Sequence, residues 1–406
     1  MLILYIISFV FTVSLTYVFW KRLTYNIIIN TPVFIIVILY QFFGESFQFK
    51  TLNEDIYLYF SLFTALGAFI EIFMVVIMRH AYNNTIPVVD VLRVPASFCF
   101  VVMCMSIVIL CMAFSFASEY GVVSEEFENK MASGFVGHTL VFLMITPPFI
   151  YLAYANKNIK KITFLLLIAL VYFCLFLKQV KSWIMIPSLY FFLMYIYFNK
   201  IHAKRFLVYS FFVSILLFIF FFAVYYFKSV ISNPNSDAVG LLGQIYQHFL
   251  FYLFSGVGAF SEYLKENNTA NFSDWSVLVL PIVNIINFFS GSPMESAINP
   301  VNYVINNEMK NKSNVFTMFG TLWMYLDYFS LFFYGILVAL QSMLYISRSN
   351  VISCSIYWLI TSFGFFSWFE YYYFHLASYE APLYVLILSI LFLGKNSEKQ
   401  MCYNNT

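Results

Sequence analysis

Long apolar runs constrain the fold of this chain more than any other feature of its sequence. A helix needs about 20 consecutive apolar residues to cross the hydrocarbon core of a bilayer, and such runs recur along the whole chain of 406 residues. Hydrophobic residues make up 62% of the chain and charged residues only 10%, whereas soluble domains carry about 25% charged residues. The sequence therefore predicts an all-α polytopic integral membrane protein.

We expect about eleven transmembrane helices, because about eleven runs reach or approach the length that a spanning helix needs. They cover residues 2–20, 25–43, 56–78, 95–117, 134–155, 162–177, 182–199, 206–227, 328–347, 351–369 and 374–394. The first run has no basic segment before it and no small-residue cleavage site after it. It is therefore expected to be retained as a helix and not to act as a signal peptide.

Charges in the connections between these runs alternate along the chain, which predicts its orientation. One set of connections carries every arginine and only two acidic residues, Asp90 and Glu398. The other set carries lysines and most of the acidic residues. Because positively charged connections stay in the cytoplasm, the first set is expected there. The N-terminus is then outside and the C-terminus inside, as an odd number of spans requires.

This topology divides the sequence into three regions. Residues 1–227 form an N-terminal membrane bundle of about eight helices, and residues 328–406 form a second bundle of about three helices with a short cytoplasmic tail. Between them, residues 228–327 form a large outer loop. Its two moderately apolar pieces, 241–260 and 275–289, are expected to be interfacial or re-entrant helices, since proline and asparagine interrupt the second. A further hairpin of two spans is the alternative.

The cytoplasmic connections are too short to hold a nucleotide-binding fold, so any chemistry is expected on the outer face. The sequence contains no HExxH, GxSxG or glycine-rich phosphate-binding motif, and no spacing typical of a metal site. We therefore expect no metal, no cofactor and no nucleic acid partner. The six cysteines lie in apolar runs or in the C-terminal tail, and we interpret them as packing residues without disulfides.

A pair of lysines lies on a very short outer turn, in the segment LKQVKSW (177–183). Lys178 and Lys181 are three residues apart, so they can share one face of a helix. Two interpretations of the pair remain open. Either the lysines only extend their ammonium groups toward the lipid headgroups, or they form a fixed cationic site that stabilises negative charge near the membrane surface.

A second outer turn, FEYYYFHLASYE (369–380), is rich in aromatic residues. Tyrosine faces stack on sugar rings while their hydroxyl groups find polar partners, so Tyr371, Tyr372 and His375 are candidate sugar contacts. An interfacial aromatic belt explains the same tyrosines equally well.

Two acidic residues lie in apolar surroundings. Glu71 is well inside the third run, so we expect it to pair with polar groups between helices and not to act in catalysis. Asp327 follows a polar lead-in that contains Asn314 and Thr317. If the next helix begins near Tyr328, Asp327 lies at its first turn. There the helix dipole favours the negative charge of Asp327, and its carboxylate can cap the helix by accepting hydrogen bonds from free backbone N–H groups.

The segment SNVFTMFGTLWMYLDYFSLFFYGILVAL (313–340) resembles the signature of Wzy-type polymerases of O-antigen and capsular oligosaccharide repeat units. In that family an "SN-v-f-T-f-f-g" lead-in follows a large outer loop, and an Asp opens the next span. The matching residues here are Ser313, Asn314, Thr317, Gly320 and Asp327. The chain departs from the pattern directly after the Asp, where it has Tyr-Phe-Ser and many members have Phe-Gly. It also has Lys181 where many members carry an arginine.

The resemblance implies a glycosyltransferase with a polytopic fold related to GT-C enzymes, in the bacterial cytoplasmic membrane. The donor would be a growing glycan on undecaprenyl pyrophosphate, and the acceptor one new repeat unit on its own lipid. No nucleotide cofactor would be needed, and a chain-length regulator protein would be a further partner besides membrane lipid.

On this interpretation the candidate residues have three tasks. Lys178 and Lys181, supported by Lys228 or Lys312, would bind the pyrophosphate. His248, Glu295 and Asp327 are candidate general bases. The sugar-binding candidates are Asn314, Thr317, Tyr371, Tyr372 and His375.

Three other functions compete with this one. A flippase for the same lipid-linked sugars usually has an even number of spans in two related halves with short loops, which this sequence lacks. An O-antigen ligase shares the donor and the outer loop, and only the lead-in to Asp327 favours the polymerase. An inert structural membrane protein is the third alternative.

Overall fold

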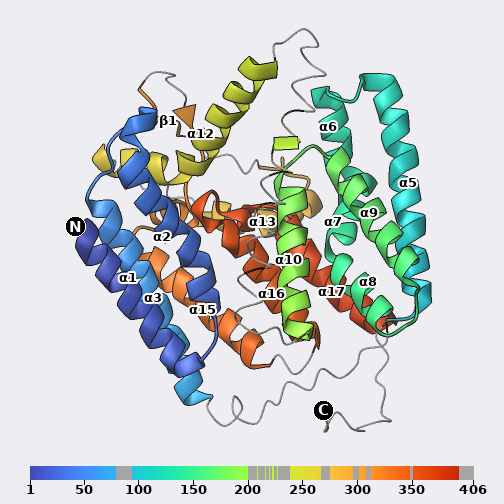
Figure 1. Ribbon diagram of the computed structural model, residues 1–406, viewed down its shortest axis with the longest axis horizontal. Coiled ribbons are helices and arrows are strands. Elements are labelled where there is room, and N and C mark those ends of the chain that lie inside the picture. The colour runs from blue at the N-terminus through green and yellow to red at the C-terminus, as the bar shows by residue number, and fades with distance from the viewer. Residues whose placement is uncertain are drawn as a thin grey trace. The chain divides into compact units, whose positions relative to one another are not determined.

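The computed structural model describes most of the chain, and nearly all of that part is helical (Figure 1). The described residues are 1–78, 94–199, 238–266, 275–295, 301–307, 312–347 and 351–392, with the isolated helical positions 208, 215, 219, 222, 223 and 226. They form fifteen α-helices, four 3-10 helices and one hairpin of two short antiparallel strands. The chain divides into two compact units, each of which is described by itself.

Unit 1 comprises Met1–Thr85, Gly243–Ser347 and Ile360–Tyr379. Its helices are α1 (Leu2–Trp20), α2 (Tyr25–Phe43), α3 (Asp55–Ile77), most of α12 (Ala238–Lys265), α13 (Leu280–Ser290), α14 (Met318–Leu326) and α15 (Phe329–Ile346). Four 3-10 turns, η1 (Glu45–Phe47), η2 (Trp275–Val279), η3 (Phe366–Trp368) and η4 (Tyr372–Phe374), connect them. Helix α3 packs against α1, α2 and α15, so it forms the centre of this unit. The strands β1 (Tyr303–Val304) and β2 (Lys312–Ser313) pair as a hairpin.

Unit 2 comprises Ile86–Leu242, Arg348–Leu359 and Glu380–Thr406. Its helices are α5 (Ala96–Tyr120), α6 (Glu125–Ala132), α7 (Gly134–Ile145), α8 (Pro147–Ala155), α9 (Lys161–Leu177) and α10 (Ser182–Phe198). Helices α16 (Val351–Phe365) and α17 (Ala377–Phe392) each begin in one unit and end in the other. Helix α7 is bent by 43° from α8, because Pro147 and Pro148 have no N–H group to continue the helix.

The helices confirm a multi-pass membrane protein. Six are long and apolar enough to cross a bilayer, and the bent α7–α8 pair would be a seventh. Helices α1, α2, α3, α5 and α15 begin and end within three residues of the expected runs. Helices α9, α10 and α17 also lie where spans were expected, but each has 17 residues or fewer. The run 206–227 lies outside the described residues apart from isolated positions, so the count of eleven and the orientation stay predictions.

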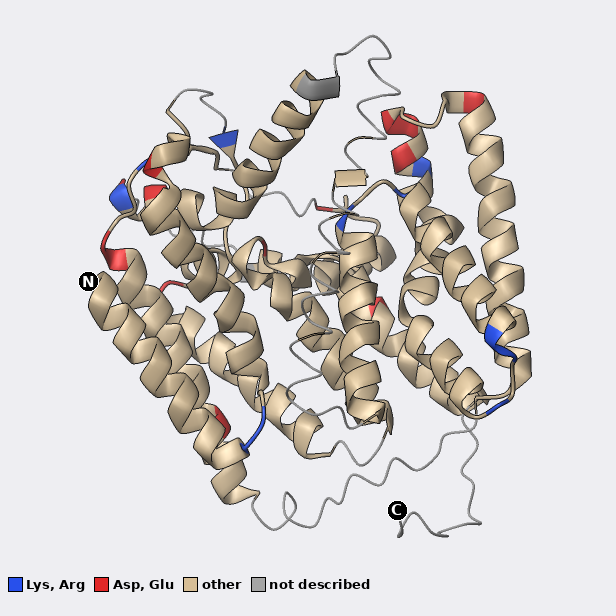
Figure 2. Ribbon diagram, viewed as in Figure 1, with Lys and Arg blue, Asp and Glu red and all other residues tan. Residues whose placement is uncertain are grey.

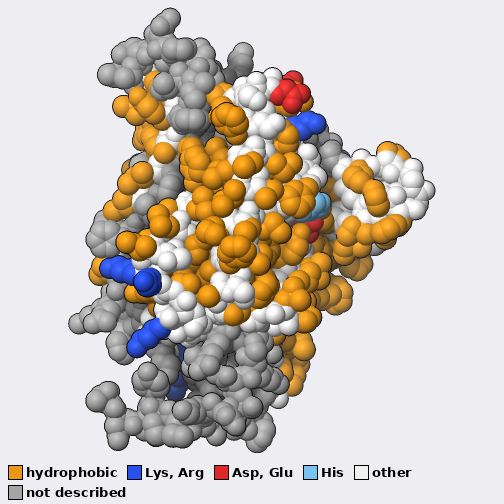
Figure 3. Space-filling view, turned by 90° about the vertical axis from the view of Figure 1, so that its right-hand side faces the viewer, with side chains coloured by type: hydrophobic (Ala, Val, Ile, Leu, Met, Phe, Trp, Pro, Cys, Tyr) orange, Lys and Arg blue, Asp and Glu red, His pale blue; other side chains and the backbone are white. Residues whose placement is uncertain are grey.

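The outer surface of the helices fits a lipid environment. Figure 2 shows charged residues mainly at helix ends and connections, with the middles of the helices largely free of them. The face that carries α5 is covered mostly by hydrophobic side chains (Figure 3). On α5 itself, Phe100, Ile107 and Phe114 are 62%, 48% and 79% exposed. Apolar surface of this extent is typical of contact with lipid.

The described part of the predicted outer loop is folded. The piece 241–260 lies within α12, and Phe254, Val257 and Phe260 of that helix are buried in unit 1. The piece 275–289 forms η2 and α13. Helix α12 therefore belongs to the packed body of unit 1, whereas α13 buries only Leu280 and Pro281 and exposes apolar side chains such as Phe288 and Phe289.

Glu71 joins two helices of unit 1, as the sequence predicts. Its carboxylate accepts hydrogen bonds from the hydroxyl of Thr24 at 2.6 Å and from the backbone N–H of Asn26 at 2.8 Å. Helix α2 begins at Tyr25, so Glu71 binds donors at the start of α2 that have no partner within the helix. The acid therefore caps a neighbouring helix.

A buried polar network continues from this cap between α2, α3 and α15. The side-chain oxygen of Asn26 accepts hydrogen bonds from Tyr334 at 2.6 Å and from Asn30 at 2.9 Å, and Asn30 in turn accepts one from Thr64 at 3.0 Å. Polar side chains within spanning helices are usually paired in this way across helix contacts. Gly67 makes the network possible, because a Cβ atom there would lie only 2.1 Å from Oδ1 of Asn26.

Gly67→Ala is therefore expected to destabilise the protein by about 1–3 kcal/mol through overpacking. Thermal unfolding of the purified protein in detergent would measure the loss. The matched control is Gly243→Ala in α12, where nothing lies within 4 Å of the added Cβ. This change should be neutral or stabilise the helix by about 0.5–1 kcal/mol. Equal stability of the two variants would contradict the role given to Gly67.

Candidate functional site

Thr317 of the polar lead-in is a helix cap. It is fully buried, and its hydroxyl accepts a hydrogen bond from the backbone N–H of Gly320 at 2.9 Å at the start of α14. Gly320 lies against the ring of Phe260, where a Cβ atom would come within 2.8 Å. The polar lead-in therefore ends as the cap of a short helix that is held against α12, and the Thr317 hydroxyl is engaged with the backbone.

Asp327 ends α14 with a backbone conformation that side chains rarely adopt, at φ 50° and ψ −129°. Its N–H donates to the carbonyl of Trp323 at 2.8 Å, and its own carbonyl accepts from the N–H of Ser330 at 3.0 Å. The capping residue of α15 is Tyr328, and no side chain caps that helix. The predicted position of Asp327 directly before the first turn of this helix is confirmed, whereas the predicted cap by its carboxylate is not among the hydrogen bonds of the described residues. Because Asp327 must also end α14, its carbonyl and not its carboxylate meets the next helix.

Thr317 and Asp327 are ten positions apart at opposite ends of α14, so their backbones lie about 15 Å apart along the helix axis. They cannot form one polar contact, although the lead-in and the acid belong to the same structural element.

Asp327 is followed by Tyr328, and its N–H binds the backbone of Trp323. These two rings belong to a set that we call the aromatic cluster: Tyr59, Tyr263, Tyr303, Trp323 and Tyr328. The rings of Tyr59 and Trp323 are 4.2 Å apart, those of Trp323 and Tyr328 are 5.3 Å apart, and those of Tyr263 and Tyr303 are 6.4 Å apart. Burial raises the pKa of the Tyr263 phenol, and the charges of Tyr303 and Asp327 raise it further. Tyr328 is 75% exposed, and Tyr59 and Asp327 are half-buried. Tyr263, Tyr303 and Trp323 are buried, so only Tyr59 and Tyr328 could offer a ring face to a ligand. An exposed aromatic ring next to a carboxylate is an arrangement that suits sugar binding.

The other two candidate bases lie on separate segments of unit 1. His248 is exposed on α12 and contacts the ring edge of Tyr252 at 5.3 Å. It is fifteen residues from Tyr263, which corresponds to about 22 Å along the helix axis. Glu295 is exposed after α13, where its backbone exchanges two hydrogen bonds with the side chain of Asn284 at 2.8 and 2.9 Å. The structure therefore does not bring His248 to the aromatic cluster.

The remaining candidates of unit 1 are divided between exposed and packed positions. Lys312 is exposed on β2, and Asn314 is half-buried beside it. Tyr371 is buried, and its hydroxyl donates to the carbonyl of Leu278 at 3.3 Å. Tyr372 and His375 lie together, with rings 5.6 Å apart. Lys228 lies outside the described residues.

In unit 2, Lys178 is a buried cation at the end of α9. It is only 7% exposed, and its ammonium group lies 3.3 Å from the centre of the Trp183 ring, a cation–π contact. Burial lowers the pKa of Lys178 to about 7, while the negative charge of Glu380 partly opposes that shift. The ammonium is thus poised between its charged and neutral forms near neutral pH.

Glu380 also binds a histidine that sequence reasoning missed. Nδ1 of His138 lies 2.6 Å from Oε1 of Glu380. We call Lys178, Trp183, Glu380 and His138 the lysine cluster. These residues come from the turn after α9, the first turns of α10 and α17, and the start of α7. Sequence spacing carries no signal for such a set, because its members lie up to 242 positions apart.

The turn that carries Lys178 is fixed by its neighbours. Gln179 has a positive φ of 58°, and its side-chain amide donates to the carbonyl of Val122. Lys181 is the N-cap residue of α10, and its carbonyl accepts from the N–H of Ile184 at 3.0 Å. Among the described residues, no group of three or more His, Cys, Asp or Glu side chains is placed to hold a metal ion.

The lowered pKa of Lys178 predicts how stability depends on pH. In the unfolded chain the lysine has its ordinary value of 10.5, whereas in the folded chain it is about 7. Between these values the unfolded state binds more protons, so the free energy of unfolding should rise from about pH 7 to about pH 10.5. Thermal unfolding in detergent at several pH values would detect this rise. Lys178→Met should remove it, and an identical slope in the variant would contradict the assignment.

Comparison with known proteins gives one match. A family model described as "Family of unknown function (DUF6337)" matches residues 29–400. No curated protein and no solved structure matches the chain.

Proposed function

The chain belongs to the DUF6337 family, and we propose that it polymerises oligosaccharide repeat units linked to undecaprenyl pyrophosphate on the outer face of the bacterial cytoplasmic membrane. The growing glycan would pass from one lipid carrier to a new lipid-linked repeat unit. Kinship with the polytopic GT-C glycosyltransferases is part of this proposal.

The strongest support is the setting of Asp327. Residues held in rarely populated backbone conformations cluster at functional sites, because the surrounding structure must stabilise them at a cost of about 1–3 kcal/mol. Asp327 has such a conformation and lies beside the exposed ring of Tyr328. It is also the acid of the segment that resembles the polymerase signature. A strained acid beside an exposed aromatic ring fits a residue that meets a sugar better than one that only ends a helix.

The chemistry needs no cofactor beyond the lipid-linked sugar. The bond between the anomeric carbon of the donor glycan and its phosphate oxygen breaks, and a bond forms between that carbon and a hydroxyl oxygen of the acceptor. The acceptor hydroxyl loses its proton, for which Asp327 is the best placed of the three candidate bases. The leaving lipid pyrophosphate gains negative charge.

We assign to Lys178 and Lys181 the task of stabilising the negative charge of the leaving pyrophosphate, with Lys228 or Lys312 in support. The buried ammonium of Lys178 suits this task, because an arriving anion favours the charged form of a lysine whose pKa is near neutral. Lysines act on phosphate as point charges, without the bidentate geometry of arginine.

Deletion of the gene tests the proposal against its two main alternatives. The surface glycan of the deletion strain should carry a single repeat unit in place of a ladder when it is separated on a gel. Loss of all repeat units would indicate a flippase. A normal ladder that is no longer joined to its final acceptor would indicate a ligase, and an unchanged glycan would exclude all three functions.

A further inference from the structure

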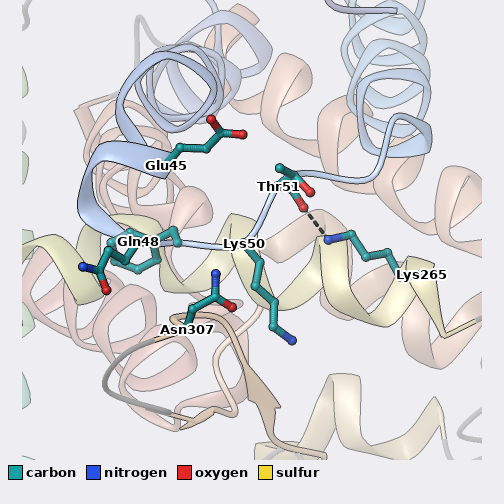
Figure 4. Close-up of a pocket in the computed structure, with 7 residues that line it drawn as sticks. Glu45, Gln48, Lys50, Thr51, Lys265 and Asn307 are labelled. Carbon is teal, nitrogen blue, oxygen red and sulfur yellow. Dashed lines mark hydrogen bonds between the residues drawn. The ribbon is translucent and has the colours of Figure 1, made fainter.

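A polar cavity of about 630 Å³ opens in unit 1 (Figure 4). Its walls come from three segments: residues 45–51 between α2 and α3, the last turn of α12, and Asn307 beyond β1. The volume lies within the range of about 300–1,000 Å³ that is common for ligand sites.

Backbone hydrogen bonds hold the walls of this cavity in place. The N–H of Lys50 donates to the carbonyl of Ile305 at 3.0 Å, and the N–H of Asn307 donates to the carbonyl of Gln48 at 3.0 Å. The segment around Phe49 thus runs antiparallel to the chain that leaves β1. A cavity whose backbone is already fixed loses little entropy when a ligand binds.

The charged groups at the cavity compensate one another. Glu262 lies between two lysines, with its oxygens 2.8 Å from Nζ of Lys50 and 2.6 Å from Nζ of Lys265. Lys265 also donates to the carbonyl of Thr51, as Figure 4 shows. Glu45 on the wall supplies a second negative charge. Two cations and two carboxylates leave no net charge, so the site favours a neutral polar ligand over a pyrophosphate.

The cavity and the aromatic cluster lie on two shared elements. On α12, Tyr263 of the cluster lies two positions before Lys265, which lines the cavity, and next to Glu262, which pairs with that lysine. On the hairpin, Tyr303 contacts the ring of Tyr263 and precedes Asn307 by four residues. The cavity and the aromatic cluster therefore draw on the same two elements of unit 1, the last turns of α12 and the chain that leaves β1.

We propose that this cavity binds neutral, hydroxyl-rich sugar residues of a glycan, at a distance from the reacting bond. Gln48 and Asn307 offer amide donors and acceptors, and Thr51 offers a hydroxyl, which match the donor and acceptor pattern of sugar hydroxyls. The inference rests on the proposed function, because it names the part of the glycan that this unit holds.

The test measures binding directly and so does not depend on polymerisation. The probe is the free oligosaccharide released by mild acid from the lipid-linked repeat unit of the producing strain. Its affinity for the purified full chain in detergent is measured by calorimetry. The variant is Gln48→Gly with Asn307→Ala. Gln48 has a φ of 63°, which glycine adopts without strain, and both side chains are exposed. The matched control is Asn129→Ala, an exposed amide on α6 of unit 2.

Each lost hydrogen bond should weaken binding about three- to tenfold, while the control should bind like the wild type. Added salt should change the affinity little, because the site has no net charge. Failure of the wild type to bind the oligosaccharide would overturn the inference, as would equal binding by the double variant. The inference would also be overturned if the double variant bound the oligosaccharide normally but lost the ability to bind inorganic pyrophosphate, because the cavity would then be an anion site. If the wild type binds the sugar but makes no polymer, the proposed function fails while the cavity assignment stands.

Discussion

Asp327→Gly is expected to unfold at a higher temperature than the wild type and to make no polymer. Glycine adopts a positive φ readily, so the substitution should relieve backbone strain of about 1–3 kcal/mol at φ 50°. The same change removes the carboxylate that the proposal places next to the sugar. A gain in stability with a loss of activity is the signature of a strained functional residue. Thermal unfolding in detergent and a glycan gel from complemented deletion cells would measure the two effects.

Two further variants separate strain from chemistry. Asp327→Asn keeps the shape of the side chain and removes its charge, so it should lose polymerisation with little change in stability. Lys21 ends α1 in the left-handed conformation, with φ at 54° and ψ at 22°. Lys21→Gly therefore relieves backbone strain at a position outside the proposed site. It should gain stability and keep full activity. Full activity of Asp327→Asn would remove the role of the carboxylate. A less stable Asp327→Gly would show that the backbone is not strained.

Lys178→Met is expected to reduce chain growth about 10²- to 10³-fold, the usual loss when a group that stabilises transition-state charge is removed. Methionine fills much of the volume of the buried lysine stem, so the fold should persist. Glu380 keeps its contact with His138 in the variant. The measurement is the rate of polymer formation by purified protein in vesicles.

The control for this variant is Lys130→Met, an exposed lysine on α6 of the same unit. It should leave the rate unchanged. Lys178→Arg keeps the positive charge, but its planar guanidinium does not reproduce the compact ammonium above Trp183. Partial activity is therefore expected from it. Wild-type rates for Lys178→Met would show that the buried ammonium is structural only.

Local patterns in the sequence predicted the helices well. Helix α2 spans the predicted residues 25–43, and α3 begins and ends within one residue of its expected run. Spanning helices are set by apolar length, which is a local property. The packing role of Glu71 was also predictable, because a buried acid between helices must find donors.

Contacts between distant residues were not predictable. The hydroxyl of Tyr334 binds Asn26 from 308 positions away, and His138 contacts Glu380 although no sequence pattern links the two residues. The conformation of Asp327 was missed for a related reason. The apolar pattern indicated where the helix after it begins, but it did not reveal that α14 ends at the same residue. Two helices joined by only two residues, Asp327 and Tyr328, constrain that connection more than either helix does alone.

Reconstitution of the purified chain is the most direct test of the central claim. Vesicles would contain only this protein and the undecaprenyl-pyrophosphate-linked repeat unit, with no nucleotide. The account predicts glycans of two, three and more repeat units on lipid, with one undecaprenyl pyrophosphate released for each bond formed and none from Asp327→Asn. Unextended repeat units with no release of undecaprenyl pyrophosphate, from a protein that is folded in the vesicles, would contradict it.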